Sequence, residues 1–449
     1  MTTGVRPVII VGGGASGVLM ACSLLREAGG HVAVTLIERS GAIGPGVAYA
    51  ARSPDHLLNV RAANMGAFAD EPDHFWRWVL EDSGRRSMCE SASDFAPRRL
   101  YGRYLQDLIA PHIGSARLTI IQDECVALTE DGGSAHAVTA NGRHLVGSAA
   151  VLATGNDVYG GYEDSDFENP MTANHPAGLR DDSAILILGS GLTMIDYVQS
   201  LSDAGFNGQI IAMSRRGLLP RSHDQVSPVS IAEADIPFGR SLASLTRWLR
   251  ARIRKEAETG MNWRAVIDAL RPHTQKIWRS LPDRERRQFL AHARAWWDVH
   301  RHRVAPEVAG FVSCMVDAGR LSVVAARLSH VARVEGGYEA AFRRRGAADD
   351  ERAFFQSVVD CRGIISDPSK STNPVIQSML RSGATAIDPL RIGIRVSPNC
   401  ALINDRGAAS KRIFALGPLT RAEFWESVAI PDIRLQAASL TAQIRRVAG

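Results

Sequence analysis

The sequence of 449 residues predicts an α/β protein with two parallel sheets and a helical segment inserted into the second. Two observations predict the sheets: a short β-branched run followed by glycines and a helical pattern occurs near Val8 and again near Ala184. A third predicts the insertion, because residues 236–305 have helix-like patterning without strong strand runs. Apolar residues make up 45% and charged residues 22%, which is ordinary for a globular protein and excludes a wholly disordered or coiled-coil chain.

The first unit opens with Val8–Val11, a continuous run typical of a buried parallel strand. Residues 12–17 then satisfy the G-x-G-x-x-G pattern, and a helix is expected over 18–28, ended by the glycines at 29 and 30. The first glycine of this pattern allows a tight turn, the second lets the backbone approach a pyrophosphate, and the third lets helix and strand pack closely. The start of the helix also offers free N–H groups to phosphates. The predicted ligands of a dinucleotide here are Gly12, Gly14, Ser16 and Gly17.

The second strand of this unit is expected over residues 32–37 and ends in Glu38. An acidic residue at this place hydrogen-bonds the ribose hydroxyls of a dinucleotide. A lone glycine pattern is weak evidence, whereas strand, glycines, helix, strand and terminal acid in one unit favour a nucleotide site. The alternative is an ordinary glycine-rich turn in an α/β domain.

The second unit repeats this order with a strand over 184–188, glycines at 189 and 191, a helix through Leu201 and a strand over 209–213. Met194 replaces the third glycine, so we expect looser packing of this helix on its strand. The predicted ligands of the second dinucleotide are Gly189, Gly191 and Thr193. The strand over 357–359 is expected to return the chain from this fold.

Arginines at 215 and 216 follow the last strand of the second unit, where an acidic residue would favour NAD. Guanidinium groups suit the 2′-phosphate of NADP, so Arg215 and Arg216 are predicted to bind it. The alternative is that both are simply solvated. Two dinucleotide folds in one chain suggest a tightly held flavin in the first and a nicotinamide that delivers hydride in the second.

The inserted segment 236–305 carries 16 Lys and Arg against 6 Asp and Glu, a balance of +10 in a chain of net charge +5, which leaves −5 for the rest. It also holds five of the eight Trp, and Pro272 and Pro282 divide it into short helices. We expect a helical cap. Basic charge with aromatics is also typical of nucleic-acid binding, but no recognised motif accompanies it and the arginines occur singly among apolar residues.

Two His and two Arg alternate at 300–303, where the cap rejoins the second unit. We expect this cluster to bind NADP phosphates or an anionic substrate, with His300 and His302 as candidate catalytic bases. The alternative is a structural cap at the end of a helix before Pro306. No carboxylate or Cys completes a metal site locally, so no metal is expected.

Six Cys occur, and none forms a C-x-x-C pair, which excludes a local zinc ribbon or dithiol motif and argues against a disulfide-stapled secreted fold. Glycines interrupt the apolar run near the N-terminus, so a signal peptide is not expected. No apolar run is long enough for a membrane span. We therefore expect a cytoplasmic protein that binds neither membrane nor nucleic acid; its oligomeric state is open.

Several stretches resemble the bacterial FAD-NAD(P)-binding flavoprotein family, which is related to flavin-containing and N-hydroxylating monooxygenases. They span nearly the whole chain and comprise Gly44–Tyr49, Leu57–Val60, Pro97–Arg98, Tyr101–Gly102, Val151–Gly155, Trp296–Arg303, Ala415–Thr420, Phe424–Glu426 and Ile430–Arg434. The resemblance implies that residues 152–155 pack against the adenosine half of FAD and that Gly417 begins the terminal flavin turn. Pro418 stands where an Asp often binds the ribityl chain, and Asp360–Gly363 departs from the usual N-C-T-G pattern, so those contacts are not expected unchanged.

The resemblance adds further expected cofactor ligands, namely Arg39, Tyr49, Asn59, Thr154, Gly155, Gly417 and Thr420. It also places Phe424 and Trp425 just after the terminal turn, where an aromatic ring stacks on the flavin or walls the substrate pocket. Trp425 is therefore a candidate active-site residue, and core packing is the alternative.

The resemblance implies an NAD(P)H-dependent flavin monooxygenase with FAD and NADP (or NAD) as cofactors and O₂ as co-substrate. A flavin C4a-(hydro)peroxide would hydroxylate a small polar, anionic, nitrogen-containing molecule such as urate or an amino acid. The alternatives are a flavin reductase or dehydrogenase that does not oxygenate, and a module that binds FAD without turnover. The expected domains are 1–180 with 366–449 for FAD, 181–235 with 306–365 for NAD(P), and 236–305 for the insert.

Overall fold

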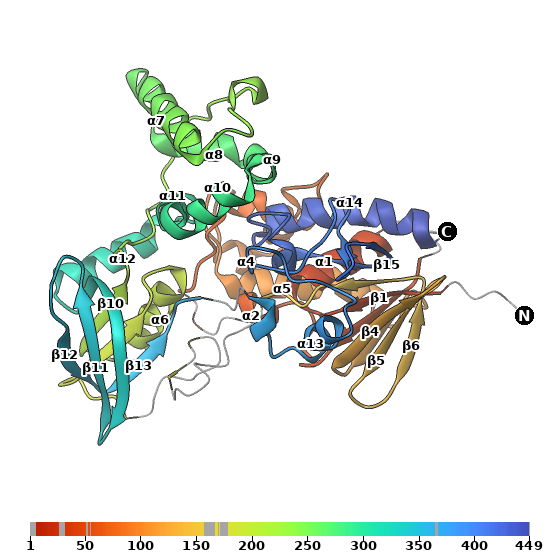
Figure 1. Cartoon of the computed structure of the whole chain (residues 1–449), viewed down its shortest axis with the longest axis horizontal. Helices are drawn as coiled ribbons and strands as arrows, with labels where there is room; N and C mark the ends of the chain where they lie inside the picture. Colours follow the sequence, from red (N-terminus) through yellow and green to blue (C-terminus); the bar gives the residue numbers. More distant parts are fainter. Residues whose placement is uncertain are drawn as a thin grey trace, which may run out of the picture. The chain divides into compact units, whose positions relative to one another are not determined.

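The computed structural model describes residues 6–26, 32–50, 53, 55–156, 167, 168, 170, 178–363 and 367–448. The chain forms two compact units (Figure 1). Unit 1 comprises residues 1–54, 60–157 and 365–449, and unit 2 comprises 55–59 and 158–364. The contacts assign the short segment 55–59 to unit 2 and divide the chain again between 157 and 158. The sequence predicts a single boundary in this part of the chain, between 180 and 181.

Unit 1 is built on a six-stranded sheet in the order β14-β15-β7-β1-β2-β3, parallel except for β14. The strands are β1 (Val8–Val11), β2 (Val34–Glu38), β3 (Leu118–Gln122), β7 (Ala149–Leu152), β14 (Ala401–Ile403) and β15 (Ala409–Ala415). β1 and β7 are buried along their whole length, as their apolar composition predicts. An antiparallel sheet follows β3 and comprises β4 (Cys125–Asp131), β5 (Ser134–Thr139) and β6 (His144–Gly147).

Helices α1 and α14 pack together in unit 1, and α1 also packs on α5 (Figure 1). The helices of this unit are α1 (Ala15–Leu25), α2 (Gly46–Tyr49), η1 (Ala62–Asn64), α3 (His74–Leu80), α4 (Ser83–Arg86), α5 (Arg98–Ile109), η2 (Ala110–His112), η6 (Pro368–Lys370), α13 (Pro374–Arg381), η7 (Gly417–Thr420) and α14 (Ile430–Ala448). α1 begins three residues before its predicted start because Gly14 is already its N-cap, and β2 begins at Val34 rather than at residue 32. The glycines predicted to end α1 lie outside the described residues.

Unit 2 is built on a sheet in the order β12-β11-β10-β9-β8-β13. Strands β10, β9, β8 and β13 are parallel to one another. The remaining two neighbours, β10 with β11 and β11 with β12, pair antiparallel. The strands are β8 (Ala184–Leu188), β9 (Gln209–Ser214), β10 (Leu321–Val334), β11 (Gly337–Arg344), β12 (Glu351–Phe355) and β13 (Ser357–Asp360). A buried apolar cluster that includes Leu186, Met213 and Phe355 joins β8, β9 and β12.

The helices of unit 2 are α6 (Leu192–Asp203), η3 (Glu233–Asp235), α7 (Leu242–Glu258), α8 (Trp263–Leu270), η4 (Arg271–His273), α9 (Thr274–Ser280), α10 (Asp283–Gln288), η5 (Phe289–Ala293), α11 (Arg294–Arg301) and α12 (Pro306–Asp317). Those from α7 to α11 form a helical group, in green in Figure 1, with its own small core around Val266 and Leu270. No described helix is long and apolar enough to cross a membrane.

The two mainly parallel sheets with helices between their strands confirm the predicted α/β fold.

Candidate cofactor sites

The first glycine turn, between β1 and α1, lies against the turn that follows β7. Gly12 has φ +107°, and a Cβ built there would lie 2.6 Å from the carbonyl oxygen of Ala153. A side chain is therefore excluded at this position by both conformation and space. The structure thus brings Thr154, predicted from the A-T-G pattern, beside the first glycine, and Gly155 follows it in the chain. Gly17 fits the same arrangement, because a Cβ there would clash with the carbonyl oxygen of Gly12.

Gly14, the second glycine of the turn, has free space beside it, although neither its backbone conformation nor its neighbours require a glycine. Its φ of −72° suits any residue, and the nearest atom to a Cβ built there is Gly46 Cα at 3.5 Å. The residue caps α1, whose first N–H groups have no partner within the helix. Free space beside unpaired donors is what a pyrophosphate needs, so the residues present fit the predicted dinucleotide.

The predicted acidic residue Glu38 holds the turn in shape. Its Oε2 accepts a hydrogen bond from the Gly13 amide at 2.6 Å, and its Oε1 accepts from the amide and hydroxyl of Ser40, both at 2.8 Å. A carboxylate has four lone-pair sites, so a ribose contact remains compatible with these bonds and stays a prediction. Its neighbour Arg39 is 68% exposed and pairs with Glu124 at 3.2 Å.

The segment 44–49 is brought to the same turn, because the amide of Gly44 donates to the carbonyl of Gly13 at 2.8 Å. Tyr49, at its end, packs its ring 4.7 Å from that of the fully buried Tyr101. Asn59, the other predicted ligand from this region, belongs to unit 2, where its carbonyl accepts a hydrogen bond from His223 at 3.0 Å.

The terminal turn of unit 1 also reaches α1. A Cβ at Gly417 would lie 2.8 Å from Ser16 Oγ, so these two predicted ligands are neighbours. Gln436 of α14 holds the turn: its Oε1 accepts from the Gly417 amide at 2.9 Å and its Nε2 donates to Thr420 Oγ1 at 3.0 Å. The Thr420 hydroxyl donates to the Gly417 carbonyl at 2.8 Å, and the residue is fully buried.

This network corrects the prediction for Thr420, whose side chain supports the turn from behind and has no surface to offer a cofactor. Gln436 is the residue that the sequence interpretation missed. The available signal was a polar side chain on the helix face that also carries the buried Ile433, Ala437 and Leu440. Trp425 is buried, with 8% of its surface exposed. The flavin-stacking role predicted for it stays a prediction.

The second glycine turn, between β8 and α6, repeats the first in detail. Gly189 has φ +114°, and a Cβ there would clash with the carbonyl oxygen of Cys361 in the turn after β13. Gly191 caps α6 with φ −92° and has nothing within 4 Å of a built Cβ. Met194 stands at the place of Gly17 and is fully buried, so its side chain fills the space between helix and strand. Thr193 lies in the first turn of α6.

The loop after β9 is fixed by short polar contacts. The Ser190 hydroxyl donates to the Leu218 carbonyl at 2.7 Å and lies 2.8 Å from Ser214 Oγ, which accepts from the Gly217 amide at 3.0 Å. Arg215 on this loop is exposed and makes no hydrogen bond or ion pair with the described residues. Its neighbour Arg216 donates to the His292 carbonyl at 2.8 Å and lies 5.9 Å from the Trp296 ring centroid.

We therefore expect the two arginines to behave differently. Arg215→Ala should raise the KM for NADPH at least about tenfold with little change for NADH, because it removes a charge-assisted contact to the 2′-phosphate. Arg216→Ala should affect both nucleotides equally, since its bonds hold the loop to the helical group. Steady-state kinetics with each nucleotide would check this, and an equal effect of Arg215→Ala on both would contradict it.

The two arginines of the cluster at 300–303 are buried, which corrects the prediction of an open anion site for them, whereas His300 and His302 are partly exposed. Arg301 and Arg303 are both buried, and Arg303 forms an ion pair with Asp268 of α8. Burial lowers the pKa of Arg303, and the nearby Asp268 opposes this shift. The His300 Nδ1–H donates to the Trp296 carbonyl at 2.7 Å, and its ring packs 4.8 Å from that of Trp263.

These contacts favour the structural alternative, in which the cluster fastens α11 onto α8. His302 continues the same helix end, where its amide donates to the Asp298 carbonyl at 2.8 Å. The role of His300 and His302 as catalytic bases stays a prediction.

Arg303→Met should accordingly lower stability rather than turnover. Removing one partner of a buried ion pair costs about 3–5 kcal/mol, and the half-exposed Asp268 reduces this to about 1–3 kcal/mol. Thermal unfolding should show the loss, whereas Arg284→Met on the exposed face of α10 should change stability by less than about 0.5 kcal/mol. A large fall in kcat per bound flavin at normal stability would instead restore a role in catalysis.

The thiols do not offer thiol–disulfide chemistry. The described cysteines are all unpaired, and five of the six are buried. Burial raises the pKa of Cys89 and Cys400 to about 11 and of Cys125 to about 12, and it raises those of Cys22 and Cys361 further. These five thiols are therefore protonated at neutral pH, and a protonated thiol is a poor nucleophile.

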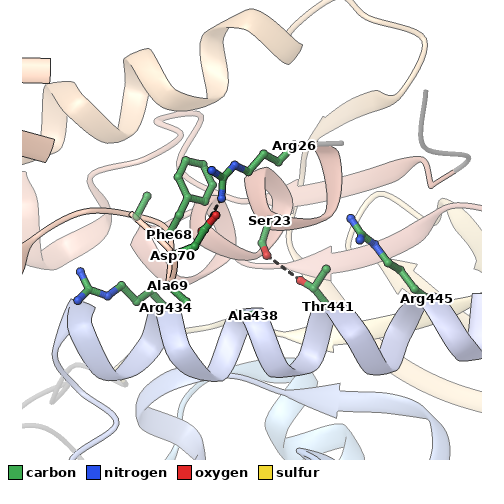
Figure 2. Close-up of a pocket in the computed structure, with 10 residues that line it drawn as sticks. Ser23, Arg26, Phe68, Ala69, Asp70, Arg434, Ala438, Thr441 and Arg445 are labelled. Carbon is green, nitrogen blue, oxygen red and sulfur yellow. Dashed lines mark hydrogen bonds and ion pairs between the residues drawn. The ribbon is translucent and has the colours of Figure 1, made fainter. Parts of the chain in front are cut away.

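A hollow of about 180 Å³ lies in unit 1 over α14, beside the C-terminal end of α1 (Figure 2). The Arg26 guanidinium lies 4.2 Å from the Phe68 ring centroid and forms an ion pair with Asp70 at 2.6 Å. The Thr441 hydroxyl donates a hydrogen bond to the Ser23 hydroxyl at 2.8 Å. Below the same loop, Arg434 donates to main-chain carbonyls. These contacts fasten the loop to both helices. The hollow is at the opposite end of α1 from the glycine turn, so it is separate from the dinucleotide site.

A family model described as FAD-NAD(P)-binding matches residues 9–157. No curated protein matches the sequence significantly. Among solved structures, an ornithine hydroxylase from Pseudomonas aeruginosa is 14% identical with a TM-score of 0.68 over 99% of this chain and 100% of that one. An ornithine N-hydroxylase from Kutzneria sp. 744, solved with reduced FAD, NADP⁺ and L-ornithine, is 14% identical with a TM-score of 0.65 over 98% and 99% of the chains. The L-lysine 6-monooxygenase from Pseudomonas syringae is also 14% identical, with a TM-score of 0.63 over 98% and 99%.

At such identities the likeness establishes the fold, and it does so over nearly the full length of each chain. The glycine turn, the A-T-G turn and the strands that carry them all lie within the residues that the family model matches. Residues 9–157 thus match the family model described as FAD-NAD(P)-binding, in agreement with the predicted resemblance. The chain as a whole has the fold of these ornithine and lysine hydroxylases.

Proposed function

We propose that the protein is an NADPH-dependent FAD monooxygenase that hydroxylates an amino nitrogen of a small amine or amino acid. The observation that carries this proposal is the pair of equivalent glycine turns. In each turn a neighbouring carbonyl oxygen leaves no room for a side chain at the first glycine. The second glycine, Gly14 or Gly191, has free space beside it, although its backbone conformation would accept any residue. Two such cradles suit two dinucleotides, one in each unit.

The choice of FAD for unit 1 and NADPH for unit 2 rests on the groups around each cradle. Unit 1 has an acidic residue, Glu38, at the end of β2, which suits ribose hydroxyls. Unit 2 has the exposed Arg215 after β9 and no acid there, which suits a 2′-phosphate.

FAD bound at the first cradle would supply the redox chemistry, namely the acceptance of hydride from NADPH and the delivery of two electrons to O₂. The overall reaction consumes the amine, O₂, NADPH and a proton, and it yields the hydroxylamine, NADP⁺ and water. The contribution of this chain is to bind and orient. The N-terminus of α1 and the open face of Gly14 hold the pyrophosphate of FAD, and Glu38 and Gln436 keep the two flanking turns in place. The described side chains need not supply a strong acid or base.

The neighbours guide the choice of substrate class. They are named for ornithine and lysine, which carry a primary amine and a carboxylate, and this agrees with the amino-acid part of the sequence-based expectation. Urate, the other molecule expected from the sequence, is not proposed, because it lacks a primary amine and none of the reported neighbours is named for it.

A single set of measurements tests the proposal. The purified protein should be yellow, and NADPH should bleach it in the absence of O₂. A screen of small amines and amino acids should then find one that increases O₂ uptake and gains one oxygen atom by mass. NADPH oxidation that yields only hydrogen peroxide with every amine would favour the reductase alternative. Bound flavin that NADPH fails to bleach would favour a binding module without turnover.

A further inference from the structure

The outer face of α7 carries a stripe of arginines, which we define as Arg247, Arg250 and Arg254. At 100° per residue these three positions fall within an arc of about 60°. All three are exposed, and none makes a hydrogen bond, ion pair or ring contact with the described residues. On the same side of the helix Ala251 lies between them, and Ala243 and Ala257 flank the stripe, so these neighbours are too small to cover the guanidinium groups.

The arginine on the inner face of the same helix, in contrast, has partners within the protein. Arg252 pairs with Glu256 at 2.7 Å, lies 3.8 Å from Asp235 and donates to the Ser230 carbonyl at 2.9 Å. Leu249 and Trp248 on this side pack against the core of the helical group. The helix therefore satisfies the cation that it turns inward, whereas the outer three make no ion pair with the described residues.

This arrangement is unfavourable for the isolated protein. Like charges three and four residues apart destabilise a helix by about 0.2–0.5 kcal/mol per pair, and the stripe contains one pair at each spacing. Glu258 is the one exposed acid of α7 and stands four residues after Arg254, at the spacing of a helical ion pair, yet the described residues show no ion pair between the two. A ligand with matched negative charges would reverse this repulsion.

We propose that the arginine stripe is a docking surface for an acidic helix of another protein. A helix with Glu or Asp at positions i, i+3 and i+7 presents carboxylates at the same spacing as the three guanidinium groups, and each pair can form a bidentate contact. The intervening alanines are small, which lets two helix axes approach to about 8–10 Å.

The composition of the face favours this partner over the other polyanions. It holds no exposed aromatic ring to stack on bases and no Asn or Gln to read them, which a single-stranded or sequence-specific nucleic-acid site would use. It also holds no exposed large apolar residue to enter a membrane, and the chain outside residues 236–305 carries a balance of −5.

Fluorescence anisotropy with two labelled synthetic helical peptides tests the proposal on the full-length, FAD-loaded protein. The matched peptide carries Glu at i, i+3 and i+7 in an alanine-rich background, and the second has the same composition with Glu distributed around the helix. At near-physiological salt the matched peptide should bind at least about tenfold more tightly. The variant Arg247→Gln/Arg250→Gln/Arg254→Gln should lose at least about tenfold in affinity.

A matched control separates the stripe from overall charge. Arg143, Arg381 and Arg406 are exposed arginines of unit 1 whose side chains make no hydrogen bond, ion pair or ring contact with the described residues. Their triple Gln variant changes the net charge by the same amount and should alter binding less than about twofold. Flavin content and NADPH oxidation should be normal in both variants, because neither set contributes to the cofactor sites.

Four results would overturn the proposal. The first is equal affinity for the two peptides, and the second is an equal loss in the two triple variants. The third is tighter, stripe-dependent binding of a short DNA duplex or of phosphatidylserine vesicles than of the matched peptide. The fourth is self-association of the wild-type protein that the stripe variant abolishes, which would make a second copy of this chain the partner.

Discussion

Gly14→Val is expected to give a folded protein that no longer holds FAD. The backbone at this residue already has φ −72°, and the nearest protein atom to a Cβ is 3.5 Å away, so the chain accepts a small side chain without strain. The added methyl groups would instead fill the space that the pyrophosphate needs. We expect the affinity for FAD to fall at least about a hundredfold, which corresponds to about 2.8 kcal/mol.

Flavin absorbance per mole of purified protein, together with circular dichroism, measures this outcome. The matched control is Gly310→Val on α12, where a Cβ also meets nothing within 4 Å but no cofactor is expected. Its flavin content should equal that of the wild type. If Gly14→Val retains FAD at wild-type affinity, the first cradle is not the flavin site.

Gly191→Val should produce the complementary defect, with FAD bound normally and NADPH excluded. Gly191 has φ −92° and open space around its Cβ, so the same physical argument applies to the second cradle. The protein should remain yellow. Anaerobic bleaching at a fixed low NADPH concentration should slow at least about a hundredfold, because the nucleotide binds that much more weakly.

Stopped-flow absorbance at the flavin band measures the rate of bleaching, and dithionite provides the control, because it reduces flavin without a nucleotide site. Dithionite should bleach the Gly191→Val protein as fast as the wild type. Loss of flavin in this variant, or normal bleaching by NADPH, would show that the two cradles have other ligands than those proposed.

The features that the sequence predicted well are those that depend on neighbours along the chain. Val8–Val11 and Ala184–Leu188 form strands at the predicted residues because continuous apolar runs of this length suit buried parallel strands. The glycines at 12, 17 and 189 lie where only glycine fits, since a turn from strand to helix restricts the backbone in the same way wherever it occurs.

The availability of individual side chains could not be read from the sequence. Thr420 was predicted as a ligand, yet its hydroxyl bonds to Gln436, sixteen residues away, and is fully buried. Arg303 was assigned to anions, but Asp268, thirty-five residues away, pairs with it in the interior. Arg216 is held by a carbonyl seventy-six residues away. Each partner comes from an element whose packing the local pattern does not specify.

The sequence by itself therefore determined the two strand–turn–helix units, their glycine cradles and the resemblance of residues 9–157 to the FAD-NAD(P)-binding model. These follow from backbone conformation and apolar periodicity, which are local properties. Only the tertiary structure decided which polar side chains remain free for ligands, because a charged or hydroxyl group that is buried must find its partner among distant elements. That requirement buries Thr420 and Arg303 and gives Arg216 a protein partner, and it leaves Arg215 and the stripe on α7 exposed.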